Sequence, residues 1–305
     1  MSLPRPITPH LWFDTQAKEA AAFYCKVFPD AGIDHVDVIR NTPSGDCDLV
    51  SFHLGGQPFM AISAGPYFSF NPSISFFLNF DPSRDPQARA RLDALWAALS
   101  DGGTALMPLD AYPFSPRYGW IQDRYGVSWQ LMTSQPEGEP RPFIVPSLLF
   151  TGEAAGQAEE ALRFYASVFD DGALGNIARR PHDMPPDKQG TLLFGDVSIN
   201  GQWLAAMDSA HPHGFAFNEA ISFIVSCRDQ AEIDRYWAKL SHVPEAEQCG
   251  WCKDRFGVAW QITPAVLEEM MRDPDEARVA RVTQAFLKMK KFDVAALQAA
   301  YGEAA

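Results

Sequence analysis

YGWIQDRYGVSWQL (residues 118–131) and CGWCKDRFGVAWQI (residues 249–262) are two versions of the same segment. The second begins 131 residues after the first, and Gly, Trp, Asp, Arg, Gly, Val, Trp and Gln recur at matching places. A repeat of this kind is sought before any other pattern, because it decides how many structural units the chain contains. The match indicates that one unit has been duplicated.

Four further pairs of segments occur in the same order in the two halves of the chain. They are AAAFYCKVF (20–28) and EALRFYASVF (160–169), GGQPFMAIS (55–63) and NGQWLAAMDS (200–209), FSFNPSISF (68–76) and FAFNEAISF (215–223), and LDALWAALS (92–100) and IDRYWAKLS (233–241). Five ordered pairs predict a tandem duplication with a Pro-, Gly- and Glu-rich linker between the copies. We therefore expect a first domain over 1–134, a linker over 135–142, a second domain over 143–264 and a helical tail over 265–305.

Each half shows the same order of strand and helix patterns. In the first half, residues 10–13 alternate as in a strand, and the apolar residues of 20–28 recur at helical spacing behind a cap at Asp14 or Thr15. The patterns that follow predict strands at 50–54, 58–62 and 74–80, a helix around 92–99 and a strand at 127–132. The tail predicts helices over 274–290, capped by Asp273, and over 294–301, capped by Asp293. The sequence therefore predicts an α+β fold of four βαβββ units, two in each half, with C-terminal helices.

Composition excludes several classes of partner. The 305 residues are 47% hydrophobic and carry a formal net charge of −13, from 25 basic and 38 acidic residues, so the surface repels phosphate backbones and we expect no nucleic acid partner. No apolar run approaches the roughly 18 residues that span a bilayer, and the N-terminus lacks the apolar core of a signal peptide. Five cysteines, an odd number without a disulfide-scaffold spacing, favour reduced thiols and a cytoplasmic protein.

Several segments together resemble one protein family. ITPHLWFDTQAKEAAAFY, FNEAISFIV, CGWCKDRFGVAWQITP and KMKKFDVAAL are similar to the PhnB-like branch of the vicinal-oxygen-chelate superfamily, which includes glyoxalase I, bleomycin-resistance proteins and extradiol dioxygenases. The resemblance implies two glyoxalase-like domains, in which paired βαβββ units curl into a cupped sheet with helices outside and a pocket inside. Members are often labelled demethylubiquinone methyltransferases, but the sequence shows no glycine-rich loop after a strand that would hold adenosylmethionine.

The resemblance also implies where a metal would bind. In metal-using relatives the ligands lie on the first strand, at the start of the second unit and on the last strand, where the last is a glutamate. The corresponding positions are His10, about Ser73 and Gln130 in the first half, and Ser147, about Ala220 and Gln261 in the second. An amide oxygen is a weak ligand, and neither half supplies a carboxylate. We therefore expect no cofactor, with a divalent metal on His10 and Gln130 as the alternative.

Strand alternation predicts which side chains line the first cup. If Leu11, Phe13, Ile74, Phe76, Trp129 and Leu131 face the helices, the opposite face carries His10, Trp12, Ser75, Phe77, Asn79, Ser128 and Gln130. These seven predicted ligand-binding residues form an aromatic surface with a few polar groups, which suits a small, partly apolar molecule. The second-half counterpart is blander and favours a structural role. Units of this superfamily pair within or across repeats, and the sequence leaves that choice open.

Three functions remain compatible with the sequence. The first is a small-molecule-binding protein without a classical metal triad, comparable to the bleomycin-resistance proteins. The second is a metal-dependent lyase, isomerase or dioxygenase-type enzyme that uses His10 and Gln130. The third is a structural protein whose duplication mimics a homodimer, so that the chain is either a monomeric pseudo-dimer or a homodimer.

Four smaller motifs receive structural interpretations. Cys249 and Cys252 form a C-x-x-C, but their counterparts in the first half are not cysteines, so neither redox nor zinc chemistry is expected there. The Asp-Arg pairs at 123–124 and 254–255 are expected to stabilise tight turns. The histidines of His211–His213 are expected in a solvated loop. Residues 111–120, in a region longer than its counterpart, could form a lid beside the first cup.

Overall fold

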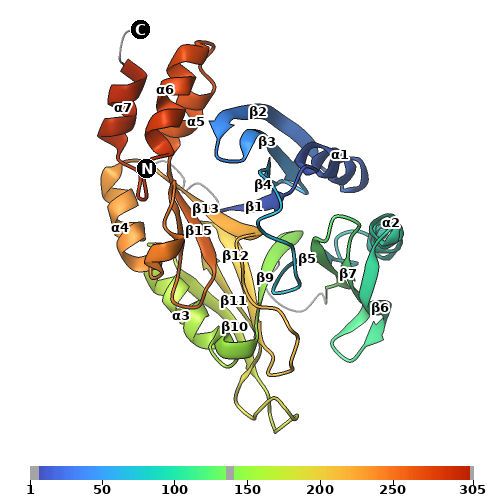
Figure 1. The fold of residues 1–305 in the computed structure, drawn as a ribbon. Coiled ribbons are helices and arrows are strands. Elements are labelled where there is room, and N and C mark those ends of the chain that lie inside the picture. Colours follow the sequence, from blue (N-terminus) through green and yellow to red (C-terminus); the bar gives the residue numbers. More distant parts are fainter. Residues whose placement is uncertain (1–6, 135–140, 303–305) are drawn as a thin grey trace.

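The computed structural model describes residues 7–134 and 141–302, and these form four units and a tail (Figure 1). The first unit contains β1 (Thr8–Phe13), α1 (Ala17–Val27), β2 (Gly32–Thr42), β3 (Gly45–Leu54) and β4 (Gln57–Ser63). The second contains β5 (Ile74–Phe80), α2 (Ala88–Ser100), β6 (Thr104–Tyr112), β7 (Ser115–Gln122) and β8 (Ser128–Thr133). Together they correspond to the first predicted domain, and most of the predicted linker, residues 135–140, lies outside the described residues.

The second half repeats this order. The third unit contains β9 (Ile144–Phe150), α3 (Ala158–Val168), β10 (Ala173–Arg179), β11 (Leu192–Ile199) and β12 (Gln202–Asp208). The fourth contains β13 (Ile221–Cys227), α4 (Gln230–Leu240), β14 (Trp251–Lys253) and β15 (Ala259–Pro264), and the tail contains α5 (Ala265–Met271), α6 (Glu276–Phe286) and α7 (Val294–Gly302). The predicted α+β fold with C-terminal helices is confirmed. Within the described residues, no helix is long and apolar enough to cross a bilayer.

Both sheets are built across the two halves. Sheet A has the order β14-β15-β13-β1-β4-β3-β2 and joins the first unit to the fourth, through antiparallel pairing of β1 with β13. Sheet B has the order β10-β11-β12-β9-β5-β8-β7-β6 and joins the second unit to the third, through antiparallel pairing of β5 with β9. Figure 1 shows both junctions in the middle of the molecule. The question of pairing that the sequence left open is therefore answered: neither half completes a sheet by itself.

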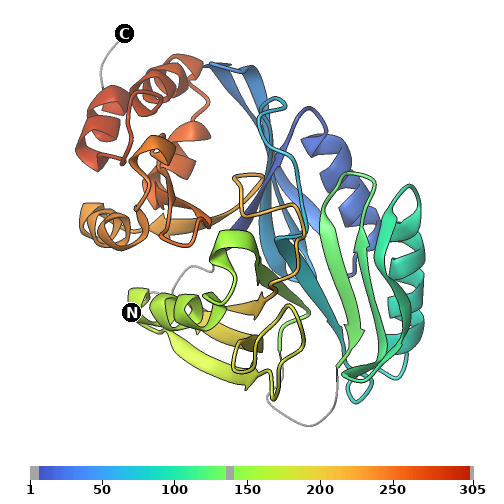
Figure 2. The same ribbon diagram turned by 60° about the horizontal axis from the view of Figure 1, so that its bottom comes forward.

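The main core lies on the helix-facing sides of the sheets. All six residues predicted to face the helices are buried there, namely Leu11, Phe13, Ile74, Phe76, Trp129 and Leu131. The core is continuous from the first unit to the second, because Tyr24 on α1 packs edge-on against Trp129 on β8 at a centroid distance of 5.4 Å. In Figure 2 the blue helix α1 lies beside the green strands of the second unit. Units of one half thus pack back to back, while their sheets are completed by the other half.

A buried aspartate in each half joins these packed units. Asp123 accepts hydrogen bonds from the Tyr24 hydroxyl (2.8 Å) and the Trp129 indole (2.8 Å), and from the backbone N–H groups of Tyr125 and Val127. Burial raises the pKa of Asp123, and the four donated hydrogen bonds oppose that rise. The aspartate stabilises its turn as predicted. Its arginine neighbour does not pair with it, because Arg124 instead binds Asp101.

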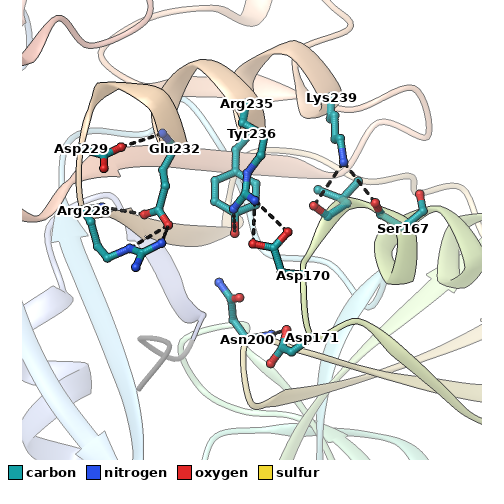
Figure 3. Close-up of polar contacts among 11 residues, drawn as sticks. Ser167, Asp170, Asp171, Asn200, Arg228, Asp229, Glu232, Arg235, Tyr236 and Lys239 are labelled. Carbon is teal, nitrogen blue, oxygen red and sulfur yellow. Dashed lines mark hydrogen bonds and ion pairs between the residues drawn. The ribbon is translucent and has the colours of Figure 1, made fainter. Parts of the chain in front are cut away.

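The second half contains the same arrangement. Asp254 accepts from the Tyr165 hydroxyl (2.8 Å), the Trp260 indole (2.9 Å) and two backbone N–H groups. Figure 3 shows a further attachment between its two units, where Arg235 of α4 forms an ion pair with Asp170 at the end of α3 (2.6 Å) and donates to the Tyr236 hydroxyl (3.0 Å). Asp123 and Asp254, the aspartates of the repeated Asp-Arg pairs, therefore have a structural function in their respective halves.

Two asparagines link the halves where the two sheets meet. Asn71 donates its amide to the carbonyl oxygen of Ala216 (3.0 Å), and Asn218 donates to the carbonyl oxygen of Ser69 (2.8 Å). Each asparagine also accepts from a backbone N–H two residues later, which fixes its own turn. These residues are the Asn of the repeated F-x-F-N segment, so the repeat connects the two halves reciprocally.

Two of the predicted helix caps are wrong. Asp14 and Thr15 do not cap α1, whose first N–H, that of Ala17, donates to the Ser63 hydroxyl of β4 (3.0 Å). The tail helix α6 begins after Asp275, which accepts from Ala277 and Arg278, rather than after Asp273. Asp293 accepts from the Ala296 N–H at the start of α7, as predicted.

The tail docks on sheet A, near both of its edges. The N–H groups of Cys249 and Gly250, just before β14, donate to the carbonyls of Met289 and Lys290 (2.8 and 2.7 Å). At the opposite edge of sheet A, the Arg272 side chain lies 4.0 Å from Asp37 of β2. The tail helices thus lie beside sheet A, and Figure 1 shows α5 and α6 next to β2.

Candidate functional site

The helix-free face of sheet B carries a second apolar cluster, and we name this face cup B. Its buried members, Phe77, Tyr118, Val145 and Ala205, come from both halves of the chain. Around them lie partly buried side chains rich in methionine and aromatic rings, namely Met107, Tyr112, Trp120, Met132, Phe194, Trp203 and Met207. Methionine and aromatic side chains adapt to ligands of varied shape, so this composition is typical of a binding surface.

A polar network lies among these apolar residues. The Tyr118 hydroxyl donates to Gln130 Oε1 (2.6 Å), and Gln130 Nε2 donates to Ser75 Oγ (2.8 Å). Ser147 lies opposite Ser75 in the β5–β9 pair and is 1% exposed, and its hydroxyl has no hydrogen-bond partner among the described residues. Buried polar groups are nearly always hydrogen-bonded, so this unpartnered hydroxyl is an exception on this face.

An ion pair completes cup B on its third-unit side. Arg141 Nε donates to Asp196 Oδ2 (2.7 Å), and the arginine side chain stacks on Trp203 with its guanidinium carbon 3.7 Å from the ring centre. Asp196 lies beside Ala205, which lies beside Ser147 in the strand register. Because the aspartate is neutralised by Arg141, it offers no free carboxylate to a ligand.

The helix-free face of sheet A, which we name cup A, repeats this arrangement with different side chains. His10 lies opposite Ser222 in the β1–β13 pair, and Gln261 Nε2 donates to Ser222 Oγ (2.9 Å). The Trp251 ring meets His10 edge-on at 5.4 Å, and Trp12 lies 5.9 Å from Trp251. His10 is 3% exposed, its Nδ1 atom has no partner among the described residues, and burial lowers its pKa to about 3.

The structure divides the seven predicted ligand-binding residues between the two cups. His10 and Trp12 belong to cup A, whereas Ser75, Phe77, Asn79, Ser128 and Gln130 lie on strands of sheet B. Ser128 accepts a hydrogen bond from the Trp120 indole (2.7 Å), and Asn79 donates to the Pro142 carbonyl (2.9 Å) instead of pointing freely into the cup. The predicted pocket within one half is therefore replaced by two cups that are each shared between the halves.

This division also corrects the expected metal positions. His10 and Gln130 lie in different sheets with different partners, so they do not form one site. The second-unit position is Ser75 rather than Ser73 in cup B, because the register places Ser75 opposite Ser147. In cup A it is Ser222 rather than Ala220, because Ser222 lies opposite His10.

Neither cup fits a divalent cation. One imidazole, one hydroxyl and one amide are offered in cup A, and two hydroxyls and one amide in cup B, without a free carboxylate. Throughout the described ranges, no three His, Cys, Asp or Glu side chains are grouped to hold a metal ion. Divalent cations in such sites are held by imidazole and carboxylate ligands together.

Residues missed by the sequence reasoning complete cup B. Val145, Phe194, Trp203, Ala205 and Met207 lie in the second half, which was expected to be structural. The predicted lid at 111–120 is instead part of the β6–β7 hairpin, whose Tyr112 borders the cup. The alternation of apolar residues in 202–208 could have identified Trp203, Ala205 and Met207, given the pairing of β12 with β9.

Two other candidate motifs have no catalytic arrangement. Both cysteines of the C-x-x-C are free thiols, and burial raises the pKa of Cys249 to about 11 and that of Cys252 further, which disfavours the reactive thiolate. His211 and His213 lie in an exposed loop, where His213 Nε2 lies 2.7 Å from the Ser209 hydroxyl.

A strand-loop-helix segment with two glycines, Thr151–Gln157 between β9 and α3, also lacks a free phosphate site. The Gly156 and Ala158 N–H groups at the start of α3 donate to Asp208 Oδ1 (2.8 and 3.1 Å), so a carboxylate already occupies the position where an anion would bind.

Comparison with known proteins gives a consistent family. The family model described as 3-demethylubiquinone-9 3-methyltransferase matches residues 5–132 and again 142–263. No curated protein matches the chain significantly. Among solved structures, a PhnB protein from Bacillus cereus is 32% identical over 43% of this chain and 100% of its own, with a TM-score of 0.37.

More distant structures follow. Glyoxalase I from Zea mays is 10% identical over 77% of this chain and 79% of its own, with a TM-score of 0.46. A fosfomycin resistance protein from Listeria monocytogenes is 12% identical over 42% of this chain and 91% of its own, with a TM-score of 0.31. The two matches of the family model cover most of the chain and coincide with the internal duplication. The chain therefore belongs to the PhnB-like family described as 3-demethylubiquinone-9 3-methyltransferase, and it carries the family's domain twice.

Proposed function

We propose that the protein binds a small, partly apolar molecule in cup B and that binding requires no metal. The observation that carries this proposal is the partly buried cluster of methionine and aromatic side chains around the Tyr118–Gln130–Ser75 network. Contact with a ligand would remove more of this apolar surface from water, at about 25 cal/mol for each Å² that is buried.

The polar groups of cup B define what such a ligand offers. Gln130 already receives the Tyr118 hydrogen bond and gives one to Ser75, so it is largely satisfied by the protein. Ser147 supplies the unused hydroxyl, which donates to or accepts from a single polar atom. A mostly apolar molecule with one hydrogen-bonding group therefore matches the site.

The family description names a methyltransferase, and we propose binding in place of that reaction. The central positions of both cups lack a catalytic carboxylate.

The neutral fluorescent probe N-phenyl-1-naphthylamine tests this proposal. We expect saturable binding of one probe in cup B, and at least about tenfold weaker binding in Met207→Glu, because a carboxylate in the apolar cluster is costly to desolvate. Ile62→Glu is the matched control, since Ile62 occupies on β4 of cup A the register position that Met207 occupies on β12. Saturable binding that is unchanged in Met207→Glu, or no saturable binding to the wild-type chain, would refute the proposal.

A structural pseudo-dimer is a second candidate, favoured by the pairing of sheets across the halves. Because one chain already completes both sheets, we propose a monomer, and light scattering after gel filtration measures this directly. The five free thiols further support a reducing, cytoplasmic location.

A further inference from the structure

The turn between β11 and β12 contains the only Asn-Gly pair in the sequence, Asn200–Gly201. Ile199 and Gln202 face each other across the turn, so these two residues alone form it. Asn200 has a φ of 47° and Gly201 a φ of 71°, as a two-residue hairpin turn of this kind requires. Asn200 is partly buried and Gly201 is exposed, so the peptide bond between them lies at the surface.

An aspartate outside the hairpin holds this turn. Asp171, shortly after α3, accepts hydrogen bonds from the Asn200 N–H through Oδ1 (2.7 Å) and from the Gly201 N–H through Oδ2 (3.0 Å). In the first half the matching turn is Gly55–Gly56, and its two N–H groups donate to backbone carbonyls (2.9 and 3.3 Å). The second half therefore differs in having both an asparagine in the turn and a carboxylate that holds the turn.

This pair of residues is chemically reactive. An asparagine followed by glycine is especially prone to lose its amide, because glycine leaves its backbone nitrogen unhindered. The Gly201 nitrogen, once it has lost its proton, attacks Asn200 Cγ and forms a new C–N bond. The bond from Cγ to the side-chain nitrogen breaks, and that nitrogen takes up a proton from water and leaves as ammonia. Water then opens the resulting succinimide to aspartate or isoaspartate, so the net reaction converts asparagine and water into aspartate and ammonia.

Asp171 opposes the first step of this reaction. Removal of the Gly201 proton leaves a negatively charged nitrogen 3.0 Å from Asp171 Oδ2. Two like charges at that separation repel each other, and even with the screening of bulk water this lowers the population of the reactive nitrogen about tenfold. The two hydrogen bonds also restrict the movement of this nitrogen towards Asn200 Cγ. Asp171 therefore slows the reaction in the folded protein.

We propose that Asn200 is a site of spontaneous deamidation and that Asp171 controls its rate. The reaction is slow while both hydrogen bonds to Asp171 are intact, and faster whenever the turn opens. The first half has no equivalent site, because glycine replaces the asparagine in its matching turn. The proposal is independent of ligand binding in cup B.

The product alters the surroundings of the attachment between the third and fourth units. Figure 3 shows Asn200 and Asp171 beside Asp170, Arg235 and Tyr236. Deamidation adds a further carboxylate here, where Arg235 forms its ion pair with Asp170 (2.6 Å). The isoaspartate form also lengthens the backbone of the turn by a carbon atom, and the register of β11 with β12 depends on the length of that turn.

Incubation of the full-length protein at mildly alkaline pH, followed by peptide mass spectrometry, tests the proposal. The readout is the fraction of Asn200 converted, measured by the mass gained when NH2 is replaced by OH. We expect Asp171→Ala to convert about tenfold faster than wild type, because the repelling charge is removed. Asp170→Ala is the matched control and should convert at the wild-type rate, because Asp170 binds Arg235 and not the turn. Wild-type protein unfolded in guanidinium chloride should also convert at least about tenfold faster than folded wild type.

Two results would overturn the proposal. One is an equal rate of conversion in folded and unfolded wild-type protein, a comparison that does not depend on any variant folding. The other is an equal rate in Asp171→Ala and Asp170→Ala, whether both match wild type or both exceed it.

Discussion

Replacing His10 with glutamine should remove a loss of stability that the wild-type protein suffers on mild acidification. Burial alone lowers the pKa of His10 from 6.5 to about 3, with no neighbouring charge contributing. In the unfolded chain the imidazole takes up a proton below its ordinary pKa of 6.5, whereas in the folded protein it does so only near pH 3. The folded state therefore loses stability as the pH falls below 6.5, and the loss levels off once the pH is below about 3.

The size of the effect follows from the width of that window. One pKa unit corresponds to about 1.4 kcal/mol, so at about pH 5 the unfolded state gains roughly 2 kcal/mol relative to the folded state through this one residue. At about pH 7.5 the contribution is close to zero. Glutamine is similar in size and neutral throughout, so the free energy of unfolding of His10→Gln relative to wild type should rise by roughly 2 kcal/mol between these two pH values.

Urea unfolding followed by circular dichroism at both pH values measures this difference. His182→Gln is the control for the change of residue type, because His182 lies on the exposed surface. The nuclear magnetic resonance titration of His10, assigned by the signal that disappears in His10→Gln, gives the pKa directly. A stability difference between wild type and His10→Gln that stays constant from pH 7.5 to 5, or a His10 signal that titrates near pH 6.5, would show that the imidazole is not buried as described.

Three further predictions concern the packing of the units and the thiols. Tyr24→Phe should lower the free energy of unfolding by about 1–3 kcal/mol, because Asp123 loses a hydrogen-bond donor in a buried position. Tyr165→Phe should lower it by about the same amount, and calorimetry or urea unfolding measures both. A near-zero change in both variants would contradict the bridging role of the two aspartates. Cleavage at a protease site placed within the linker at 135–140 should leave the two halves together in gel filtration without denaturant, because each sheet contains strands of both; separation of the fragments would contradict the shared sheets. Both thiols of the C-x-x-C should react with iodoacetamide far more slowly than free cysteine at about pH 7.5, as followed by mass spectrometry, and reaction at the rate of free cysteine would argue against their raised pKa values.

Periodicity predicted the faces of the strands because burial has the same period as the backbone. Leu11 and Phe13 face the core while His10 and Trp12 face away, as the alternation required. The same reasoning placed Phe77 on the helix-free face of sheet B, but it missed Val145, Phe194, Trp203, Ala205 and Met207 on that face. Alternation could not show which strands share a sheet, because it carries no information about a strand's neighbours. Residues of the two cups were therefore predicted to line one pocket.

Helix starts were predicted less well because their hydrogen-bond partners are distant in sequence. The first N–H of α1 is satisfied by Ser63, which lies 46 residues further along, and that of α3 by Asp208, which lies 50 residues further along. Local capping rules consider side chains that directly precede the helix, so they favoured Asp14 and Thr15. The repeat held the missing signal, since Ser63 and Asp208 occupy matching positions at the ends of β4 and β12.

The pairing of sheets across the halves explains why a site deduced from one half was divided. The strands β5 (ISFFLNF) and β13 (ISFIVSC) present nearly the same pattern, so sequence alone gives β1 an equal preference for either. The Tyr24–Asp123 bond and its twin decide the matter, because they stack the two units of a half back to back and leave β1 and β5 to find partners in the other half. Duplication therefore gives two cups that are each built from residues of both halves. A substitution in one cup can leave the equivalent position of the other cup unchanged. The two cups differ chemically in this way: cup A has His10 where cup B has Ser147, and Cys249 where cup B has Tyr118.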